Sequence, residues 1–449
     1  MNRTLARETS RTNGSFYLEA ASISGFWGSR SVEAKFFEDC SIFIGPNGSG
    51  KTTFIEILRA CLAVDLSQLA RLDFMSCQIR LRSQEGAVRT VQVERGKSES
   101  RLLDFTYKIS KRVFPLRTFS VSDRDRYPYS VTKRQDLAVE RVRTQISSLV
   151  GLSSISVNRA NLEADWARRS EPGFGEWGNA VDFALNQRIK RLLQYRMRLF
   201  DTQAQIQRSL REEVLLSLIE PEEGEQELNF SFFESEKERK RLSENLRRTF
   251  LRLGVSRKDL NKKVGSYVED ITQRVEKTKR FFDKVRDEFE DPSSVQHLLA
   301  DLMGERYQII QSVTSKTLES DGEIEKLYEP LRGFEEIVNR FFNQKKISLS
   351  PSGFSVLGQE EDIEIALEHL SSGEKQLLIL LTEVFLQRRQ KFVFITDEPE
   401  LSLHIEWQGE LLDSIRTLNP NAQIVIATHS PEIASSAPTR IIQMSRIVR

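Results

Sequence analysis

Cysteine, histidine and long apolar runs are all scarce in this 449-residue sequence, and each shortage argues against a class of protein. The three cysteines, Cys40, Cys61 and Cys77, lie neither in a CxxC pair nor near a histidine cluster, which disfavours a metal site and favours reduced thiols in the cytoplasm. No stretch approaches the ~20 apolar residues of a membrane span, and the first residues lack the apolar core of a signal peptide. We therefore expect a soluble cytoplasmic protein that does not enter a membrane.

Net charge is nearly absent as well, with 66 basic against 65 acidic side chains. A polyanionic partner such as DNA would have to meet a locally basic surface. Between Lys237 and Arg280 the basic residues alternate with acids, which favours a solvated helical hairpin with internal ion pairs. A second group of basic residues has few acidic neighbours and is a better candidate for contacts with phosphates. It consists of Arg188, Lys190, Arg191, Arg196 and Arg198.

The strand and helix patterns divide the chain into a short tail and three further parts. We predict a disordered tail at 1–15, a first α/β part at 16–160, a helical insert at 161–345 and a second α/β part at 346–449. The second α/β part reads helix, strand, helix, strand, an alternation that predicts a parallel sheet. Because the first part also contains a short apolar strand followed by a helix, the sheet is expected to draw strands from both ends of the chain.

Turn residues predict several finer features. In the first part we expect two strands joined at Gly25–Gly28 and a hairpin over 76–96. In the insert, Gly254 and Gly265 are candidate turns between helices, and two more helices are expected to flank Asp321-Gly322. A last hairpin is expected over 345–358.

The most informative motif is a glycine-rich loop between a predicted strand and a predicted helix. It fits GxxxxGK[ST], in which backbone N–H groups converge on phosphates at a helix N-terminus. Lys51 is expected to reach the β- and γ-phosphates of a nucleotide, and the Thr52 hydroxyl to bind Mg²⁺. A chance glycine-rich turn is the weaker interpretation. The nucleotide-binding residues so predicted are Gly45, Pro46, Asn47, Gly48, Ser49, Gly50, Lys51, Thr52 and Thr53.

Three later motifs are weak when taken singly. The apolar strand 392–396 ends in Asp397 and Glu398, which suit Mg²⁺ binding and polarisation of an attacking water, but an ordinary strand exit looks the same. The run Ser371, Ser372, Gly373 and Glu374 opens a helix and is equally a capping box. His429, one of four histidines, directly follows the last apolar strand, where ligands meet open α/β sheets.

In order and spacing these motifs resemble the ATP-binding cassette (ABC) ATPases, in the branch that holds the SMC, Rad50 and RecF proteins. They look most like the ATPases of bacterial anti-phage systems: Septu, PARIS and retron-associated ATPases and the ATPase half of OLD-family proteins. The resemblance covers about residues 17–65 and 330–440. It implies an α/β head, in which a P-loop parallel sheet joins an antiparallel β subdomain, with an inserted helical or short coiled-coil domain.

The resemblance also implies roles for the motif residues. Lys51, Glu398 and His429 would act in ATP hydrolysis, with Glu398 as the base and His429 as the switch histidine, while Thr52 and Asp397 would hold Mg²⁺. Ser371, Ser372, Gly373 and Glu374 would form the signature that contacts ATP held by a second copy. A head-to-tail homodimer is therefore implied, a higher assembly stays open, and turnover is expected to be slow. The glutamine loop of the family is not identifiable; Gln78 and Gln92 are weak candidates.

Two functions follow from the resemblance. The first is an ATPase subunit of an anti-phage defence complex that regulates a separate effector nuclease of HNH or TOPRIM type. It is favoured because OLD-family proteins continue into a TOPRIM domain, whereas this sequence ends 20 residues after His429 and contains no nuclease pattern. The alternative is a RecF- or SMC-like repair ATPase that binds DNA in an ATP-dependent way without an effector.

Overall fold

The computed structural model describes residues 16–96, 102–119, 129–156, 180–219, 236–252, 257–285, 305–350, 353–358, 363–387 and 390–449. The predicted tail and the predicted boundary near residue 160 lie outside these ranges. Contacts within the chain define two compact units, one from the residues up to Tyr195 together with Gly333–Arg449, and one from Arg196–Arg332. The domain bounds predicted from the sequence stay a prediction.

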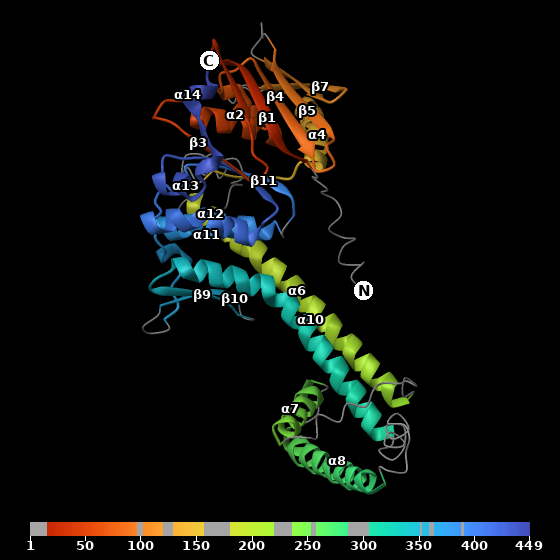
Figure 1. Ribbon diagram of the computed structural model, residues 1–449. Helices are drawn as coiled ribbons and strands as arrows, with labels where there is room; N and C mark the ends of the chain where they lie inside the picture. The colour runs from red at the N-terminus through yellow and green to blue at the C-terminus, as the bar shows by residue number, and fades with distance from the viewer. Residues whose placement is uncertain are drawn as a thin grey trace. The chain divides into compact units, whose positions relative to one another are not determined.

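The first unit contains a parallel sheet whose strands come from distant parts of the sequence (Figure 1). All neighbouring strands are parallel, which confirms the α/β prediction. In sheet order the strands are β13 (Ile441–Gln443), β3 (Cys40–Ile44), β12 (Ala422–Ala427), β11 (Phe392–Asp397) and β8 (Leu152–Ser156). Strands β3, β11 and β12 were predicted; β8 and β13 were not.

A second sheet in this unit is antiparallel and has six strands. The predicted pair around Gly25–Gly28 and the predicted hairpin over 76–96 both form, and two further strands extend the sheet. Its strands, in sheet order, are β2 (Arg30–Lys35), β1 (Phe16–Phe26), β4 (Ser76–Ser83), β5 (Val88–Arg95), β6 (Leu102–Ile109) and β7 (Arg112–Phe119).

Helix α2 (Lys51–Ala63) joins the two sheets, because it contacts β11 and β12 of the parallel sheet and β4 of the antiparallel sheet. Its side chains Phe54, Ile57 and Leu58 are fully buried in the core that these sheets share. A 13-residue helix is marginal by itself in water. Burial of each large apolar side chain contributes about 1.5–3 kcal/mol, so packing between two sheets stabilises the helix that follows the glycine-rich loop.

The remaining elements of the first unit pack around the two sheets or form a small hairpin. Helix α11 (Ser372–Leu386) is buried along most of its length, which explains its nearly continuous apolar sequence. The hairpin predicted over 345–358 is present as β9 (Lys345–Ser350) and β10 (Gly353–Gly358). The other elements are α3 (Leu66–Arg71), α4 (Tyr129–Leu149), η4 (Leu367–His369), α12 (Ile405–Leu418), α13 (Pro431–Ser436), η5 (Pro438–Arg440) and α14 (Met444–Ile447).

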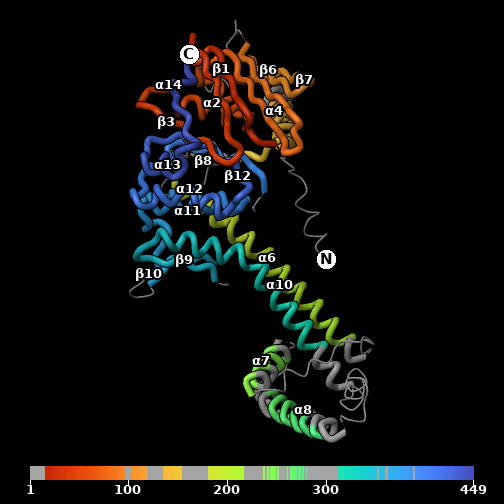
Figure 2. The backbone as a smooth tube through the Cα atoms, in the orientation of Figure 1, coloured from red at the N-terminus to blue at the C-terminus, as the bar shows by residue number. Residues whose placement is uncertain are grey.

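The chain enters the second unit along one long helix and leaves it along another, as can be followed in Figure 2. They are α6 (Ala180–Ile219) and α10 (Glu305–Phe341), and they pack side by side through a cluster of Leu210, Val214 and Val313. The Tyr328 hydroxyl donates a hydrogen bond of 2.8 Å to Gln203 across the same pair. The shorter helices α7 (Glu236–Arg252) and α8 (Arg257–Val285) contact one another within this unit.

Two predicted turns in the insert are wrong. Gly265 lies inside α8, and Asp321-Gly322 lies inside α10, which continues through it as one helix. A glycine inside a helix costs only about 1 kcal/mol relative to alanine, which the apolar stripes on either side offset. Gly254 lies outside the described residues. Within the described ranges, none of these helices is both long enough and apolar enough to span a membrane.

Candidate functional site

Three neighbouring strands of the parallel sheet end at one edge and bring the predicted motifs together. In the register of the sheet, Phe43 of β3 lies opposite Ala427 of β12, and Ala427 lies opposite Asp397 of β11. The glycine-rich loop, His429 and Glu398 therefore follow three adjacent strands at nearly the same level. Ligands bind at such carboxyl edges in open α/β sheets.

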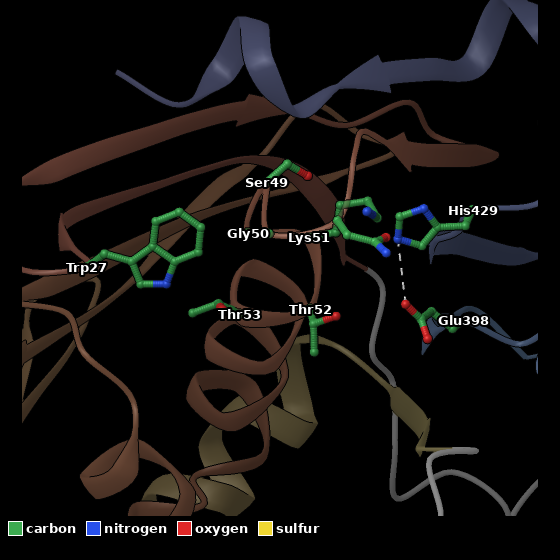
Figure 3. A pocket seen from close by; sticks show the side chains of 10 residues that line it. Trp27, Ser49, Gly50, Lys51, Thr52, Thr53, Glu398 and His429 are labelled. Atoms are coloured by element: carbon green, nitrogen blue, oxygen red, sulfur yellow. Dashed lines mark ion pairs between the residues drawn. The ribbon is translucent and has the colours of Figure 1, made fainter.

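A pocket of about 270 Å³ lies at this edge. Figure 3 shows Trp27 at one side of the glycine-rich loop, and His429 and Glu398 at the other. Of the predicted nucleotide-binding residues, seven line the pocket, whereas Gly45 and Pro46 do not. The lining residues are Trp27, Asn47, Gly48, Ser49, Gly50, Lys51, Thr52, Thr53, Glu398 and His429.

The glycine-rich loop depends on backbone geometry that other residues adopt with difficulty. Gly48 and Gly50 have φ angles of 76° and 92°. A Cβ atom on Gly50 would lie 2.8 Å from the ring of Phe26 and 3.1 Å from that of Trp27. Glycine therefore both permits the left-handed turn into α2 and leaves room for the aromatic side chains beneath it.

Lys51 is directed into the loop that precedes it. Its ammonium donates hydrogen bonds to the carbonyl oxygens of Gly45, at 2.9 Å, and Pro46, at 3.3 Å. The residue is only 4% exposed. Burial lowers the pKa of Lys51, and the carboxylates of Glu398 and Asp397 oppose that shift. The lysine is thus a buried cation close enough to the acidic end of β11, two strands away from β3 in the sheet, to interact with it electrostatically.

Asp397 has a buried carboxylate oxygen that lacks a hydrogen-bond partner. Thr52 hydrogen-bonds to its side chain, while Oδ1 is buried and lacks a hydrogen-bond partner. Burial raises the pKa of Asp397 to about 6; the Thr52 hydrogen bond opposes the shift, and the charges of Glu398, Glu56 and Glu400 add to it. A buried carboxylate oxygen beside a threonine hydroxyl is the donor set expected for Mg²⁺ in a P-loop site.

The described residues contain no cluster of three or more His, Cys, Asp or Glu side chains that could hold a metal ion by itself. Mg²⁺ binds through one or two carboxylates together with waters and substrate phosphates. Thr52 and Asp397 therefore fit the ion as half of a site that phosphate oxygens complete. The Ser49 hydroxyl, also buried without a partner, is a further unsatisfied group beside the pocket.

Glu398 and His429 lie next to each other at one side of the pocket (Figure 3). Their nearest atoms, Glu398 Oε1 and His429 Nε2, are 3.7 Å apart, and both side chains are about one-third exposed. Glu398 has a φ angle of 45°, which is strained for a residue with a side chain. Strained backbone at a partly exposed carboxylate is typical of functional sites rather than of the core.

The family of the chain follows from this sequence and geometry together. Residues 40–435, which include every strand of the pocket edge described above, match the AAA_21 family, described as "AAA domain, putative AbiEii toxin, Type IV TA system". The chain belongs to this family. The predicted resemblance to P-loop ATPases is therefore confirmed for most of the chain.

Curated relatives of this AAA-domain protein match it over shorter stretches. The Septu protein PtuA of Bacillus thuringiensis is 27% identical over 103 residues, which are 20% of this chain and 26% of the relative. The Retron Ec83 probable ATPase of Escherichia coli is 23% identical over 154 residues, 31% of this chain and 26% of the relative. The Retron Vc95 probable ATPase of Vibrio cholerae is 27% identical over 115 residues, 23% of this chain and 22% of the relative. The chain thus spans about a quarter of the length of these relatives.

Among solved structures, the AAA-domain protein aligns with the Smc head domain with an extended coiled coil of Pyrococcus furiosus, bound to the C-terminal domain of ScpA. The alignment covers 94% of this chain and 92% of the other at 15% identity, with a TM-score of 0.44. The Smc head domain with coiled coil and joint of Pyrococcus yayanosii aligns over 95% of each chain at 14% identity, with a TM-score of 0.41.

The predicted signature residues of this AAA-domain protein do not line the pocket. Ser371 caps helix α11 and forms a complete capping box with Glu374, so the capping interpretation is confirmed. Lys345 donates to both oxygens of Glu374 at 2.8 Å. Burial alone would raise the pKa of Glu374, but the hydrogen bonds from Lys345 and Ser371 outweigh it and hold the pKa low. Ser371 and Ser372 remain exposed at the helix N-terminus.

Sequence reasoning missed Trp27, which lines the pocket from the turn between β1 and β2. The available signal was an aromatic residue inside a glycine-flanked turn, directly between two predicted strands. Trp27 has a φ angle of 54° and packs against Phe26, with ring centroids 4.8 Å apart. Neither Gln78 nor Gln92 lines the pocket; they face each other on β4 and β5.

Proposed function

We propose that this protein binds ATP with Mg²⁺ and hydrolyses it. The observation that carries the proposal is the convergence of Lys51, Glu398 and His429 on one pocket at the carboxyl edge of three adjacent strands. Asp397 does not line the pocket but precedes Glu398 and is close enough to influence Lys51 electrostatically. Lys51 and the N-terminus of α2 supply positive charge, and the β11 end supplies carboxylates. That combination suits a polyphosphate held with a divalent cation.

Binding of ATP would change the partners of Lys51. Its ammonium now bonds two loop carbonyls, and a lysine in this position transfers to phosphate oxygens when they enter the loop. The backbone N–H groups from Asn47 to Thr53 would surround the same phosphates. Trp27, at the opposite side of the loop from His429, would offer an aromatic face to the adenine base.

Thr52 and Asp397 would hold Mg²⁺, which neutralises charge on the phosphate oxygens when bound. Glu398 would orient a water and accept its proton while the water oxygen bonds to the γ-phosphorus and the bond to the β-phosphate oxygen breaks. ADP leaves with the electron pair of that bond. His429 Nε2, 3.7 Å from Glu398, would hydrogen-bond the γ-phosphate. We expect slow turnover.

The pocket of one copy is half of a working site in this proposal. Its volume lies near the lower end of the roughly 300–1,000 Å³ of small-molecule sites, and it is open on one side. Ser371 and Ser372, exposed at the N-terminus of α11, are oriented by the capping box and are suited to contact an anion. We propose that they meet the γ-phosphate held by a second copy in a head-to-tail homodimer.

We further propose that the ATPase serves an anti-phage defence complex and regulates a separate nuclease subunit. Similarity to a Septu protein and to two retron ATPases supports this proposal. DNA is a weaker candidate partner: Arg188 and Arg191, two of the five basic residues proposed for phosphate contacts, form ion pairs with Glu383 of the same unit.

Phosphate release from ATP tests the central proposal. Wild type should hydrolyse ATP in a Mg²⁺-dependent way, and Lys51→Ala should lose nucleotide binding. The matched control is Lys35→Ala, which removes an exposed lysine of β2 and should behave like wild type. Equal ATP binding by Lys51→Ala and wild type would overturn the assignment of the pocket.

Two further measurements test the assembly. Native mass spectrometry of Glu398→Gln with ATP and Mg²⁺ should show a homodimer that is absent without nucleotide. Affinity purification from the native host should recover a separate nuclease with wild type. Recovery of only the protein itself and DNA would replace the regulatory proposal with the DNA-repair alternative.

A further inference from the structure

The carboxylate of Glu400 makes an unusual set of contacts close to the pocket. Its Oε1 atom accepts three hydrogen bonds: from the Thr428 hydroxyl at 2.6 Å, from the His429 N–H at 2.7 Å and from the Ser430 N–H at 3.2 Å. All three donors are consecutive residues at the end of β12. One oxygen of Glu400 therefore fixes the backbone from which the His429 side chain extends.

His429 depends on this backbone anchor because its ring is weakly held. The imidazole is 37% exposed, and its 3.7 Å distance from Glu398 exceeds that of a hydrogen bond. Its neighbours Thr428 and Ser430 are buried, and the Ser430 N–H also bonds to the Thr428 hydroxyl at 2.9 Å. The position of the imidazole thus follows from the short segment that Glu400 binds.

Glu400 also belongs to the turn that carries Glu398. The N–H of Leu401 bonds to the carbonyl of Glu398 at 3.1 Å, and the N–H of Leu403 bonds to the carbonyl of Glu400 at 2.9 Å. The turn is strained at both ends, with φ angles of 45° at Glu398 and 69° at Ser402. A strained turn keeps its shape only when surrounding contacts determine it, and the Glu400 hydrogen bonds supply such contacts.

The second oxygen of Glu400 has a different environment. Oε2 is buried and lacks a hydrogen-bond partner, although its carboxylate is close enough to influence both Lys51 and Asp397 electrostatically. A buried carboxylate oxygen without a hydrogen-bond partner destabilises a fold. A simple structural anchor would not require a carboxyl group with one buried oxygen left without a partner.

We propose that Glu400 is a positioning residue for ATP hydrolysis: it ties the turn of Glu398 to the backbone of His429, so that the carboxylate and the imidazole reach the same γ-phosphate. The inference rests on the proposed ATPase function. Glu400 does not line the pocket, so it acts through Glu398 and His429 rather than on ATP itself. Its loss should impair turnover and spare nucleotide binding.

Steady-state kinetics on the full chain test this inference, with Glu400→Ala, Glu400→Gln and the control Glu410→Gln, an exposed carboxylate of α12. Misplacing a reacting group by 1 Å costs about 100-fold in rate, so Glu400→Ala should lower kcat about 100-fold. Glutamine keeps an accepting oxygen but loses the charge-assisted bonds, so Glu400→Gln should lower kcat only about tenfold. Affinity for a fluorescent ATP analogue should change less than about threefold in either variant, and Glu410→Gln should match wild type.

A wild-type kcat in either Glu400 variant would overturn the inference, as would a loss of nucleotide affinity equal to the loss of kcat. If Glu400→Ala does not fold, Glu400→Gln decides alone. Failure of the ATPase proposal is recognised separately, because wild type itself would then release no phosphate. If wild type and both Glu400 variants hydrolyse ATP equally fast, the ATPase proposal stands and only the positioning role of Glu400 is removed.

Discussion

Two clusters of charged side chains in the first unit differ in how completely they are paired. Behind the pocket lining, Asp397 Oδ1 and Glu400 Oε2 are buried without hydrogen-bond partners, and the backbone of Glu398, which does line the pocket, is strained. Around α11, Lys345 binds Glu374, and Lys375 Nζ lies 2.7 Å from Asp182. The first cluster holds buried carboxylate oxygens without hydrogen-bond partners, whereas each carboxylate of the second cluster forms an ion pair with a basic side chain.

The second cluster connects α11 to several other elements. Glu383 of α11 accepts a 2.9 Å hydrogen bond from Arg191 of α6 and a 3.0 Å bond from Gln387. Lys375 also donates to the carbonyl of Glu368 at 2.8 Å. Because breaking such pairs is costly, the N-terminus of α11 is held in a defined place. The comparison separates residues that we propose for chemistry from residues that hold α11 in place, and four predictions test it.

The largest effect is expected at the pocket. Glu398→Gln should lower kcat about 10²–10⁴-fold, the contribution of a positioned general base. Because the substitution keeps the shape and removes the proton acceptor, ATP should still bind. Single-turnover phosphate release measures the loss; a decrease below about threefold would assign the base to another residue.

The paired cluster should respond in stability. Asp182→Ala leaves the buried Lys375 with only its bond to Glu368, so we expect a loss of about 2–3 kcal/mol in the free energy of unfolding. Urea denaturation measures it. The double variant Asp182→Leu with Lys375→Met replaces the pair by apolar side chains and should recover most of the loss; equal destabilisation in both would contradict the role of the pair.

The contact between the two clusters can be tested at Gly373. A Cβ atom there would lie 2.3 Å from the carbonyl oxygen of Ser402, in the loop that follows Glu398. Gly373→Ala should therefore destabilise the fold by about 1–3 kcal/mol, since backbone has to move. Gly409→Ala is the matched control: it lies in α12 with nothing within 4 Å, and should stabilise by roughly 0.5–1 kcal/mol. The melting temperatures of Gly373→Ala and Gly409→Ala, each compared with wild type, measure the two effects.

The smallest effect has the opposite sign. Raising the pKa of Asp397 from 3.8 to about 6 corresponds to about 3 kcal/mol, and solvent at the partly exposed carboxyl reduces this to about 1–2 kcal/mol. At pH 7.5 the native state carries this cost of ionisation, so Asp397→Asn should stabilise the nucleotide-free protein while it impairs Mg²⁺ binding.

The sign of the pH dependence follows from the raised pKa of Asp397. As pH falls through 6 the native carboxyl protonates and the cost decreases, and below the unfolded pKa of 3.8 it disappears. The stabilisation by Asp397→Asn should therefore be larger at pH 7.5 than at pH 5. A gain in melting temperature that does not depend on pH would contradict the assignment to ionisation.

Strong local patterns made much of the head predictable. The apolar runs at β3, β11 and β12 are continuous because both faces of the sheet are covered, and each ends in a recognisable motif. The strand β8, with the sequence LSSIS, has no such pattern and forms because it pairs with β11. The helix α10 passes Asp321-Gly322 for a similar reason, since packing against α6 outweighs two poor helix formers.

The sequence by itself determined which residues we propose for phosphate chemistry, because the glycine-rich loop, the Asp397-Glu398 pair and His429 each follow an apolar strand whose end has to lie at a sheet edge. Only the tertiary structure decided which strands are neighbours, and hence that these motifs face one pocket. It also brought Trp27 and Glu400 to that edge. Trp27 and Glu400 meet residues that lie hundreds of positions away or on other strands, so no local sequence pattern encodes these contacts. They form through hydrogen bonding and packing between separate elements of the fold.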